Sequence, residues 1–227
     1  LSLQLATNQT EEAKKSLALR LANSSPSALP GVIGQIQRLL SRMPDKAKST
    51  ALFKELLEPY HDALDVKLIL AQLSMTSGDQ QAAIREAKDA LAKNPTSELA
   101  ALTLAQVIGD KAAAAKSLAE FLQKNPKSRD VRMAYARLLF EQSNIAEAKK
   151  EFKTLLQQYP QDQTVLYAMG LLSAQANELA DAEHYLSAYI KTLNGKADTD
   201  RDATQALMIL AQIAEDRNDL DGALQWI

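Results

Sequence analysis

The chain has 227 residues, of which 46% are hydrophobic and 24% charged, a composition typical of soluble proteins that form a core. Its formal net charge is −2, and its 26 basic and 28 acidic residues are interspersed, so the sequence offers no basic stripe for nucleic acid. It has no cysteine and no run of 18 apolar residues, which excludes disulfides, thiolate chemistry and a membrane-spanning helix in this stretch.

The residue types and the prolines together predict a helical array. Alanine and leucine make up roughly a third of the sequence, which favours helices over strands. Five of the seven prolines fall at positions 26, 59, 95, 126 and 160, at intervals of 33, 36, 31 and 34 residues. A helical chain with breaks at this period is typical of stacked helix pairs. We therefore expect a single continuous array over residues 1–227, without a domain boundary.

The prolines divide the chain into about seven units, of which the first and the last are incomplete. The predicted units are a partial unit at 1–26, a degenerate unit at 27–59, four units at 60–95, 96–126, 127–160 and 161–194, a linker at 194–202 and a partial unit at 203–227. Because the chain starts without methionine and stops inside a predicted helix, we expect it to be a piece of a longer array.

The two N-terminal units depart most from the common pattern. Ala13 is expected on the second helix of the partial unit. In the degenerate unit, Gln35 stands where a small residue is expected and Pro44 falls in the turn, although Ala47 and Ala51 indicate a second helix.

In the later units, a small residue of the first helix is followed 12 residues later by an alanine of the second helix. The matched pairs are Ala71 with Ala83, Ala136 with Ala148, Gly170 with Ala182 and Ala211 with Ala223. Two helices approach closely only where both side chains are small, so each pair predicts the contact within one helix pair. In the unit at 96–126, Ala105 and Ala114 are only nine residues apart, which predicts a trimmed turn.

This spacing resembles the tetratricopeptide repeat, a helix–turn–helix unit of about 34 residues with small residues at its eighth and twentieth positions and a proline near its end. The resemblance covers almost the whole chain. It implies an all-α fold, a right-handed α–α superhelix of about seven units, truncated at both ends. The large aromatic residue that the repeat usually carries at its fourth position is missing, and Arg132 and Leu166 stand there instead.

No arrangement of residues points to catalysis, to a cofactor or to a metal ion. His61 and His184 lie far apart and outside any metal-binding spacing, so we interpret each as a solvated surface histidine. Residues 31–34 lack the strand and the lysine of a phosphate-binding loop. We therefore predict that the protein is not an enzyme and takes no cofactor.

The resemblance also indicates where a partner would bind. The first helices of such a solenoid line its concave surface, and the second, fifth, ninth and twelfth positions of each tetratricopeptide unit face that groove. The predicted partner-binding residues are Leu68, Gln72, Met75, Leu102, Gln106, Met133, Arg137, Phe140, Tyr167, Leu171, Met208 and Gln212. The alternative for the leucines and methionines is that they pack against the neighbouring repeat.

The chemistry of these residues suits a protein or peptide partner. Methionine adapts to irregular surfaces, and the glutamine amide can bond a peptide backbone from either end. The groove lacks the cluster of lysines and arginines with which tetratricopeptide chaperone adaptors hold a C-terminal carboxylate. An acidic peptide tail is therefore a disfavoured ligand.

A second resemblance rests on three stretches in the C-terminal half. Residues 129–139 (RDVRMAYARLL), 213–217 (IAEDR) and 223–226 (ALQW) are similar to a family of proteobacterial tetratricopeptide proteins. Many of these are lipid-anchored to the outer membrane and face the periplasm, and some act as adaptors for envelope proteases or cell-wall enzymes. The resemblance implies a periplasmic scaffold, and a cytoplasmic location is the alternative.

The sequence thus predicts a non-catalytic scaffold or adaptor that binds a protein or a peptide in a concave groove. Two alternatives stay open. One is a structural module that self-associates through exposed terminal repeats, and the other is the regulatory arm of a larger protein whose active domain lies outside this stretch. Whether the groove takes a helix or an extended peptide is equally open.

Overall fold

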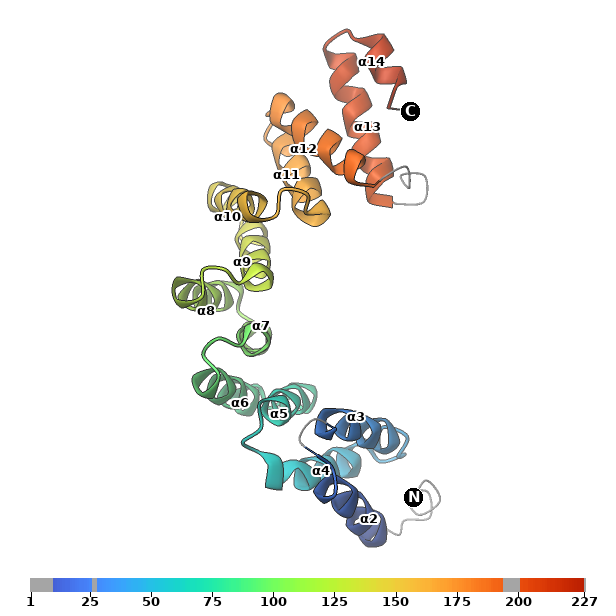
Figure 1. Ribbon diagram of the computed structural model, residues 1–227, viewed down its shortest axis with the longest axis vertical. Helices are drawn as coiled ribbons and strands as arrows, with labels where there is room; N and C mark the ends of the chain where they lie inside the picture. Colours follow the sequence, from blue (N-terminus) through green and yellow to red (C-terminus); the bar gives the residue numbers. More distant parts are fainter. Residues whose placement is uncertain (1–9, 26–27, 194–200, 227) are drawn as a thin grey trace. The chain divides into compact units, whose positions relative to one another are not determined.

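Figure 1 shows the computed structural model, which describes residues 10–25, 28–193 and 201–226. Within these residues all regular secondary structure is helical, which confirms the predicted all-α fold. The chain forms two compact units, Leu1–Gly109 and Asp110–Ile227, which we call unit 1 and unit 2. The continuity of the array from one unit to the other stays a prediction.

The helices of unit 1 follow one another as the repeat pattern predicts. They are α2 (Thr10–Ala22), α3 (Leu29–Leu40), α4 (Lys46–Leu57), the short 3-10 helix η1 (Glu58–Tyr60), α5 (Leu64–Thr76), α6 (Gln80–Lys93) and α7 (Glu98–Ile108). The helix pairs are α3 with α4 and α5 with α6, and α7 packs on α6. α2 lies where the sequence predicts the second helix of the first partial unit.

The helices of unit 2 continue the same order. They are α8 (Lys111–Lys124), α9 (Arg129–Glu141), α10 (Ile145–Gln158), α11 (Gln163–Gln175), α12 (Leu179–Thr192), α13 (Arg201–Asp216) and α14 (Leu220–Leu224). α13 begins inside the predicted linker at 194–202, and the remainder of that linker lies outside the described residues. None of the described helices combines the length and the apolar character that a membrane span requires.

Local sequence signals set the helix ends. The Asp79 carboxylate accepts a hydrogen bond from the Ala82 amide at 2.9 Å and so caps the first turn of α6. The second helices α6, α8 and α10 end two residues before Pro95, Pro126 and Pro160. These prolines therefore stand just after the second helices, where a proline ends a helix without straining it.

The predicted small residues lie where the two helices of a pair meet. The buried alanine pairs are Ala71 with Ala83, Ala136 with Ala148 and Ala211 with Ala223. A β-carbon on Gly170 would clash with the Leu186 side chain and lie 3.3 Å from its backbone nitrogen. Glycine is therefore what allows α11 to approach α12 at this point.

The degenerate pair of α3 and α4 keeps the helix pairing but uses different residues. Ile36 and Ser49 are buried at the contact, whereas Gln35 and Ala47 are exposed. The Ser49 hydroxyl donates a hydrogen bond to the Leu40 carbonyl oxygen at 2.7 Å, which satisfies its buried oxygen. The assignment of Gln35 to the inter-helix position is therefore wrong, because the helix turns Ile36 toward the contact instead.

The short unit at 96–126 loses residues in two places. α7 has 11 residues, against 13 in each of α5, α9 and α11. Its turn consists of Gly109 and Asp110, whereas the turns that follow α5, α9, α11 and α13 have three residues each. The predicted trimmed turn thus accounts for only part of the shortening, since the first helix is shorter as well.

Unit 1 contains a buried lysine in a polar cluster. Lys67 on α5 is fully buried, and its Nζ lies 2.5 Å from Asp89 Oδ2 and 3.1 Å from His61 Nδ1. His61 Nε2 lies 3.2 Å from Glu86 Oε1. The interpretation of His61 as a freely solvated side chain is therefore wrong. The Lys67 hydrogen bond lowers the pKa of Asp89 below its usual value, because it stabilises the carboxylate form.

Candidate functional site

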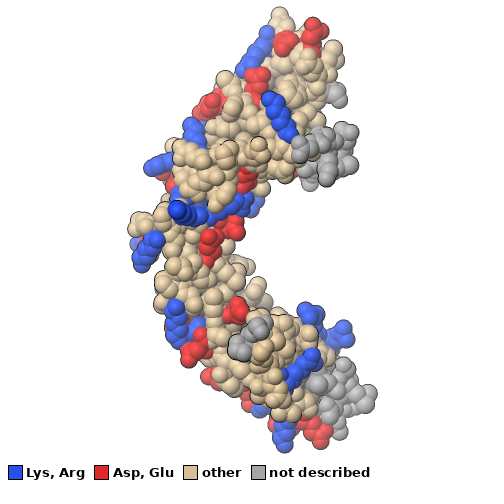
Figure 2. Space-filling view, in the orientation of Figure 1, with Lys and Arg blue, Asp and Glu red and all other residues tan. Residues whose placement is uncertain are grey.

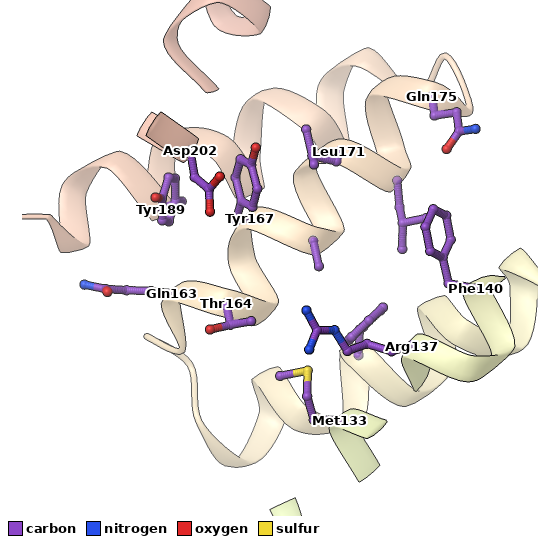
Figure 3. Close-up of a pocket in the computed structure, with 13 residues that line it drawn as sticks. Met133, Arg137, Phe140, Gln163, Thr164, Tyr167, Leu171, Gln175, Tyr189 and Asp202 are labelled. Atoms are coloured by element: carbon purple, nitrogen blue, oxygen red, sulfur yellow. The ribbon is translucent and has the colours of Figure 1, made fainter. Parts of the chain in front are cut away.

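Unit 2 carries an open pocket of about 470 Å³, lined mainly by side chains of α9 and α11 (Figure 3). The lining combines apolar and aromatic side chains with a few polar ones. The lining residues are Met133, Arg137, Phe140, Phe152, Gln163, Thr164, Tyr167, Ala168, Leu171, Leu172, Gln175, Tyr189 and Asp202. Five of the twelve predicted partner-binding residues are among them, namely Met133, Arg137, Phe140, Tyr167 and Leu171.

α9 contributes one stripe of three side chains. Met133, Arg137 and Phe140 are spaced by four and three residues, which places them on the same face of the helix. Met133 is 9% exposed, whereas Phe140 is 40% exposed. The Arg137 guanidinium points into the space between α9 and α11 in Figure 3. This wall of the pocket therefore presents a thioether, an aromatic ring and a cation.

α11 contributes the facing stripe, with Thr164, Tyr167 and Leu171 spaced by three and four residues. The Tyr167 ring packs on the Tyr189 ring of α12, with their centroids 5.1 Å apart and the planes tilted by 43°. The Tyr167 hydroxyl donates a hydrogen bond to Gln205 Oε1 at 2.7 Å. These contacts hold the ring from both ends, so this aromatic wall is formed before any ligand arrives.

Two arginines next to the pocket hold the repeats together. Arg129 Nε donates a hydrogen bond to Asp162 Oδ2 at 2.9 Å, which joins the start of α9 to the N-cap of α11 and raises the pKa of Arg129. Arg132 pairs with Glu151 of α10 and donates a hydrogen bond to the Pro126 carbonyl oxygen at 2.8 Å. Arg132 thus replaces the usual aromatic residue with polar contacts to the preceding turn and the following helix.

The other seven predicted residues do not line this pocket. Leu68 is 7% exposed and packs with Ala90 and Ala100, so it is not part of an open groove. Met75 packs against the hydrophobic cluster around Ala71. The packing of these two residues agrees with the alternative that they contact neighbouring helices, and their role in partner binding stays a prediction. Leu102 is half-buried, and the exposed remainder are Gln72, Gln106, Met208 and Gln212.

The sequence did not single out the remaining lining residues. Thr164 stands at the second position of its unit, so the same positional rule identifies it. Phe152 and Tyr189 belong to the second helices α10 and α12, which the rule leaves out. Asp202 lies before the predicted start of the last unit at 203, because α13 begins earlier than the repeat pattern indicates.

The charges around the site are sparse. Basic and acidic side chains are interspersed over the face shown in Figure 2. Arg137 and Asp202 are the two charged residues in the pocket lining. No group of three His, Cys, Asp or Glu side chains within the described ranges is arranged to hold a metal ion. The lining offers apolar surface and hydrogen-bonding groups, which is the chemistry of a binding site for a side chain and its backbone.

Several solved structures share this arrangement of helices. The chain is similar to PilF of Pseudomonas aeruginosa, with 16% identity and a TM-score of 0.59 over 96% of this chain and 90% of that one. It is similar to PilW, a type IV pilus biogenesis factor, with 16% identity and a TM-score of 0.58 over 89% and 91%. At these identities the likeness shows the fold alone. A comparison with curated proteins finds no significant match.

A further similar structure is YrrB, described as a tetratricopeptide repeat protein with an unusual peptide-binding site. The identity is 14% and the TM-score 0.54, over 76% of this chain and 87% of that one. Helix pairs joined by short turns, with small residues at their contact, define a helical repeat protein. Models of the tetratricopeptide repeat match residues 109–172 and 167–227, which together are just over half of the chain. The chain belongs to the tetratricopeptide repeat family.

Proposed function

We propose that this chain is a non-catalytic scaffold or adaptor, and that a segment of a partner protein binds in the pocket of unit 2. Tetratricopeptide repeats are in general protein-interaction modules without catalytic activity. The observation that carries the proposal is the pocket, where α9 and α11 present apolar and hydrogen-bonding side chains to one open space. The periplasmic location stays a prediction from the resemblance.

The size and the lining of the pocket support this role. Its volume of about 470 Å³ lies within the range of about 300–1,000 Å³ that is common for ligand pockets. Tyr167 and Arg137 are of the residue types that carry most binding energy at protein interfaces. Because the Tyr167 ring is already held by Tyr189 and Gln205, ordering it costs little when a partner binds.

A random library of 12-residue peptides displayed on phage tests the proposal. The library is selected on the wild-type chain, and the dissociation constants of enriched peptides are measured by fluorescence anisotropy. We expect Phe140→Ala to weaken binding about tenfold, since a buried aromatic contact at an interface contributes on the order of 1–2 kcal/mol. Phe140 is 40% exposed, so its removal leaves the fold largely intact.

The matched control is Leu99→Ala, which removes an exposed apolar side chain of unit 1. Leu99 is 58% exposed and does not line the pocket, so its removal leaves peptide affinity unchanged. Circular dichroism confirms that both variants keep their helix content. Equal affinities for wild type, Phe140→Ala and Tyr167→Ala would show that the pocket is not the binding site.

A second candidate function is self-association, and exposed side chains near the C-terminus favour it. Met208, Leu220 and Leu224 are 69%, 64% and 73% exposed. Leu220 and Leu224 are four residues apart on α14 and so share a face, and exposed apolar faces are typical of surfaces that another molecule covers. Analytical ultracentrifugation of wild type and of the variant with Leu220→Asp and Leu224→Asp tests this candidate. A monomer at all concentrations in both proteins would exclude it.

A further inference from the structure

The pocket contains an arginine, Arg137, that has no acidic partner among the described residues. Among the side chains that the structure describes, Arg137 forms no hydrogen bond or ion pair. The other described arginines of unit 2 that flank the helix pairs have acidic partners. These pairs are Arg129 with Asp162, Arg132 with Glu151 and Arg217 with Glu183. Arg137 therefore differs from them in offering all its donors to a ligand.

The surroundings of Arg137 would strengthen an ion pair with a ligand. Met133 and Phe140 lie one turn before and one turn after it on α9, and Leu171 lines the same pocket from α11. A ligand that covers these apolar side chains removes water from the guanidinium, and an ion pair is stronger in that setting than in bulk water. The planar guanidinium matches a carboxylate, which it binds through two parallel hydrogen bonds.

Resting on the proposed function, we propose that the pocket recognises an internal peptide motif in which a bulky apolar side chain stands next to an aspartate or glutamate. The apolar side chain binds against Phe140, Tyr167 and Leu171. The carboxylate pairs with Arg137. The partner is thus a protein segment whose chemistry combines one hydrophobic anchor with one negative charge.

The charges of the lining limit the motif to a single acid. Arg137 is the one basic residue of the pocket lining, and the other charged lining residue, Asp202, is acidic. A peptide with several acids would place some of them without a cation and close to Asp202. This agrees with the expectation that an acidic tail is a poor ligand, and it distinguishes the motif from such a tail.

The test selects the same peptide library on four forms of the full chain, namely wild type, Arg137→Gln, Arg137→Lys and Lys153→Gln. Lys153 is an exposed lysine of α10 outside the pocket, so Lys153→Gln is a control for the loss of one positive charge. The most enriched wild-type peptide is then made in two versions, with its acid or with the matching amide. Fluorescence anisotropy at low and high salt measures the dissociation constants of both versions.

We expect an acid next to an apolar residue to be enriched by wild type and Lys153→Gln and lost with Arg137→Gln. Changing the acid to the amide weakens binding to wild type at least about tenfold, since the charged hydrogen-bonded pair with Arg137 is lost. The same change has no effect on binding to Arg137→Gln. Arg137→Lys retains part of the preference, because an ammonium keeps the charge but not the planar geometry.

Two other outcomes overturn the inference in distinguishable ways. If the acid and amide peptides bind wild type equally well, and Phe140→Ala still weakens both, the pocket binds peptides without using Arg137. The proposed function then stands and the motif is wrong. If no enriched peptide depends on Phe140 or Tyr167, the proposed function fails and the motif fails with it.

Discussion

Unit 1 and unit 2 differ in the residues that take a left-handed conformation in the turns after their first helices. The backbone takes a left-handed conformation at Gly78 (φ 82°) and Gly109 (φ 73°) in unit 1. The matching residues of unit 2 are Ser143 (φ 62°), Asn177 (φ 57°) and Asn218 (φ 64°). Glycine adopts this conformation freely and asparagine tolerates it, whereas serine does so at a cost of roughly 1 kcal/mol. In unit 2 the backbone strain therefore falls mainly on Ser143.

The contact between the two helices of a pair also differs between α3–α4 of unit 1 and α11–α12 of unit 2. In unit 1, α3 and α4 meet through large side chains such as Ile36 and Phe53. In unit 2, α11 meets α12 at Gly170, where a β-carbon would not fit. Phe140 stands four residues after Ala136 on α9, and Tyr167 stands three residues before Gly170 on α11, so each lines the pocket beside a close contact of its helix pair.

The largest effect is expected from overfilling a helix contact of unit 2. Ala136→Leu adds three carbons at a fully buried position between α9 and α10, and we expect the free energy of unfolding to fall by about 2–3 kcal/mol. Urea denaturation followed by circular dichroism measures it. The control Ala146→Leu places the same side chain on an exposed position of α10 and leaves stability nearly unchanged. An unchanged urea midpoint for Ala136→Leu would contradict the close contact.

Alanine in place of glycine should act in opposite directions in the two units. The β-carbon added by Gly170→Ala clashes with Leu186, and we expect the free energy of unfolding to fall by about 1–2 kcal/mol. The β-carbon added by Gly34→Ala in α3 lies 3.7 Å from the end of the Arg38 side chain, which is an ordinary contact. The free energy of unfolding should therefore rise by up to about 1 kcal/mol, because alanine favours the helix more than glycine does. Thermal unfolding of both variants provides the comparison. A gain at Gly170 equal to that at Gly34 would rule out the tight approach of α11 and α12.

The turn residues predict a smaller pair of effects. Gly78→Ala introduces a β-carbon at positive φ and should lower the stability of unit 1 by about 1 kcal/mol. Ser143→Gly removes the corresponding strain in unit 2 and should raise its stability by about 0.5–1 kcal/mol. Differential scanning calorimetry measures both shifts. Destabilisation by Ser143→Gly would mean that the serine side chain contributes more than its backbone strain costs.

The last effect depends on pH and concerns the carboxylates that pair with lysines of unit 1. Hydrogen bonds from Lys67 and Lys93 lower the pKa values of Asp89 and Asp62, respectively. A carboxyl group whose pKa is lowered in the folded state stabilises the fold at pH values above its unfolded pKa of about 4. This stabilisation is lost as the pH falls through the folded pKa. We expect Asp89→Asn to lower the melting temperature of unit 1 at pH 7 and to have no effect at pH 2. A difference that does not vary with pH would contradict this assignment.

The accuracy of the sequence-based predictions depended on the size of the side chains involved. The pairs Ala136 with Ala148 and Gly170 with Ala182 were identified because small residues recur at a fixed spacing where two helices touch. Gln35 was assigned wrongly, since a degenerate unit with Ile36 at its contact carries no small-residue signal. The spacing of residues does not identify the lining residue Tyr189. It lies on a second helix, and the angle at which that helix packs decides whether its side chains line the pocket.

Periodicity alone determined the helical repeats, their order and the stripe of Met133, Arg137 and Phe140, because residues four and three apart share a helix face whatever surrounds them. Tertiary packing decides which of these helix faces remain exposed. Met75 stands at the same repeat position as Phe140, yet it is partly buried against the cluster around Ala71, while Phe140 is 40% exposed and lines the pocket. Whether such a position is covered depends on neighbouring helices distant in sequence, and their distance and angle follow from every side chain between them.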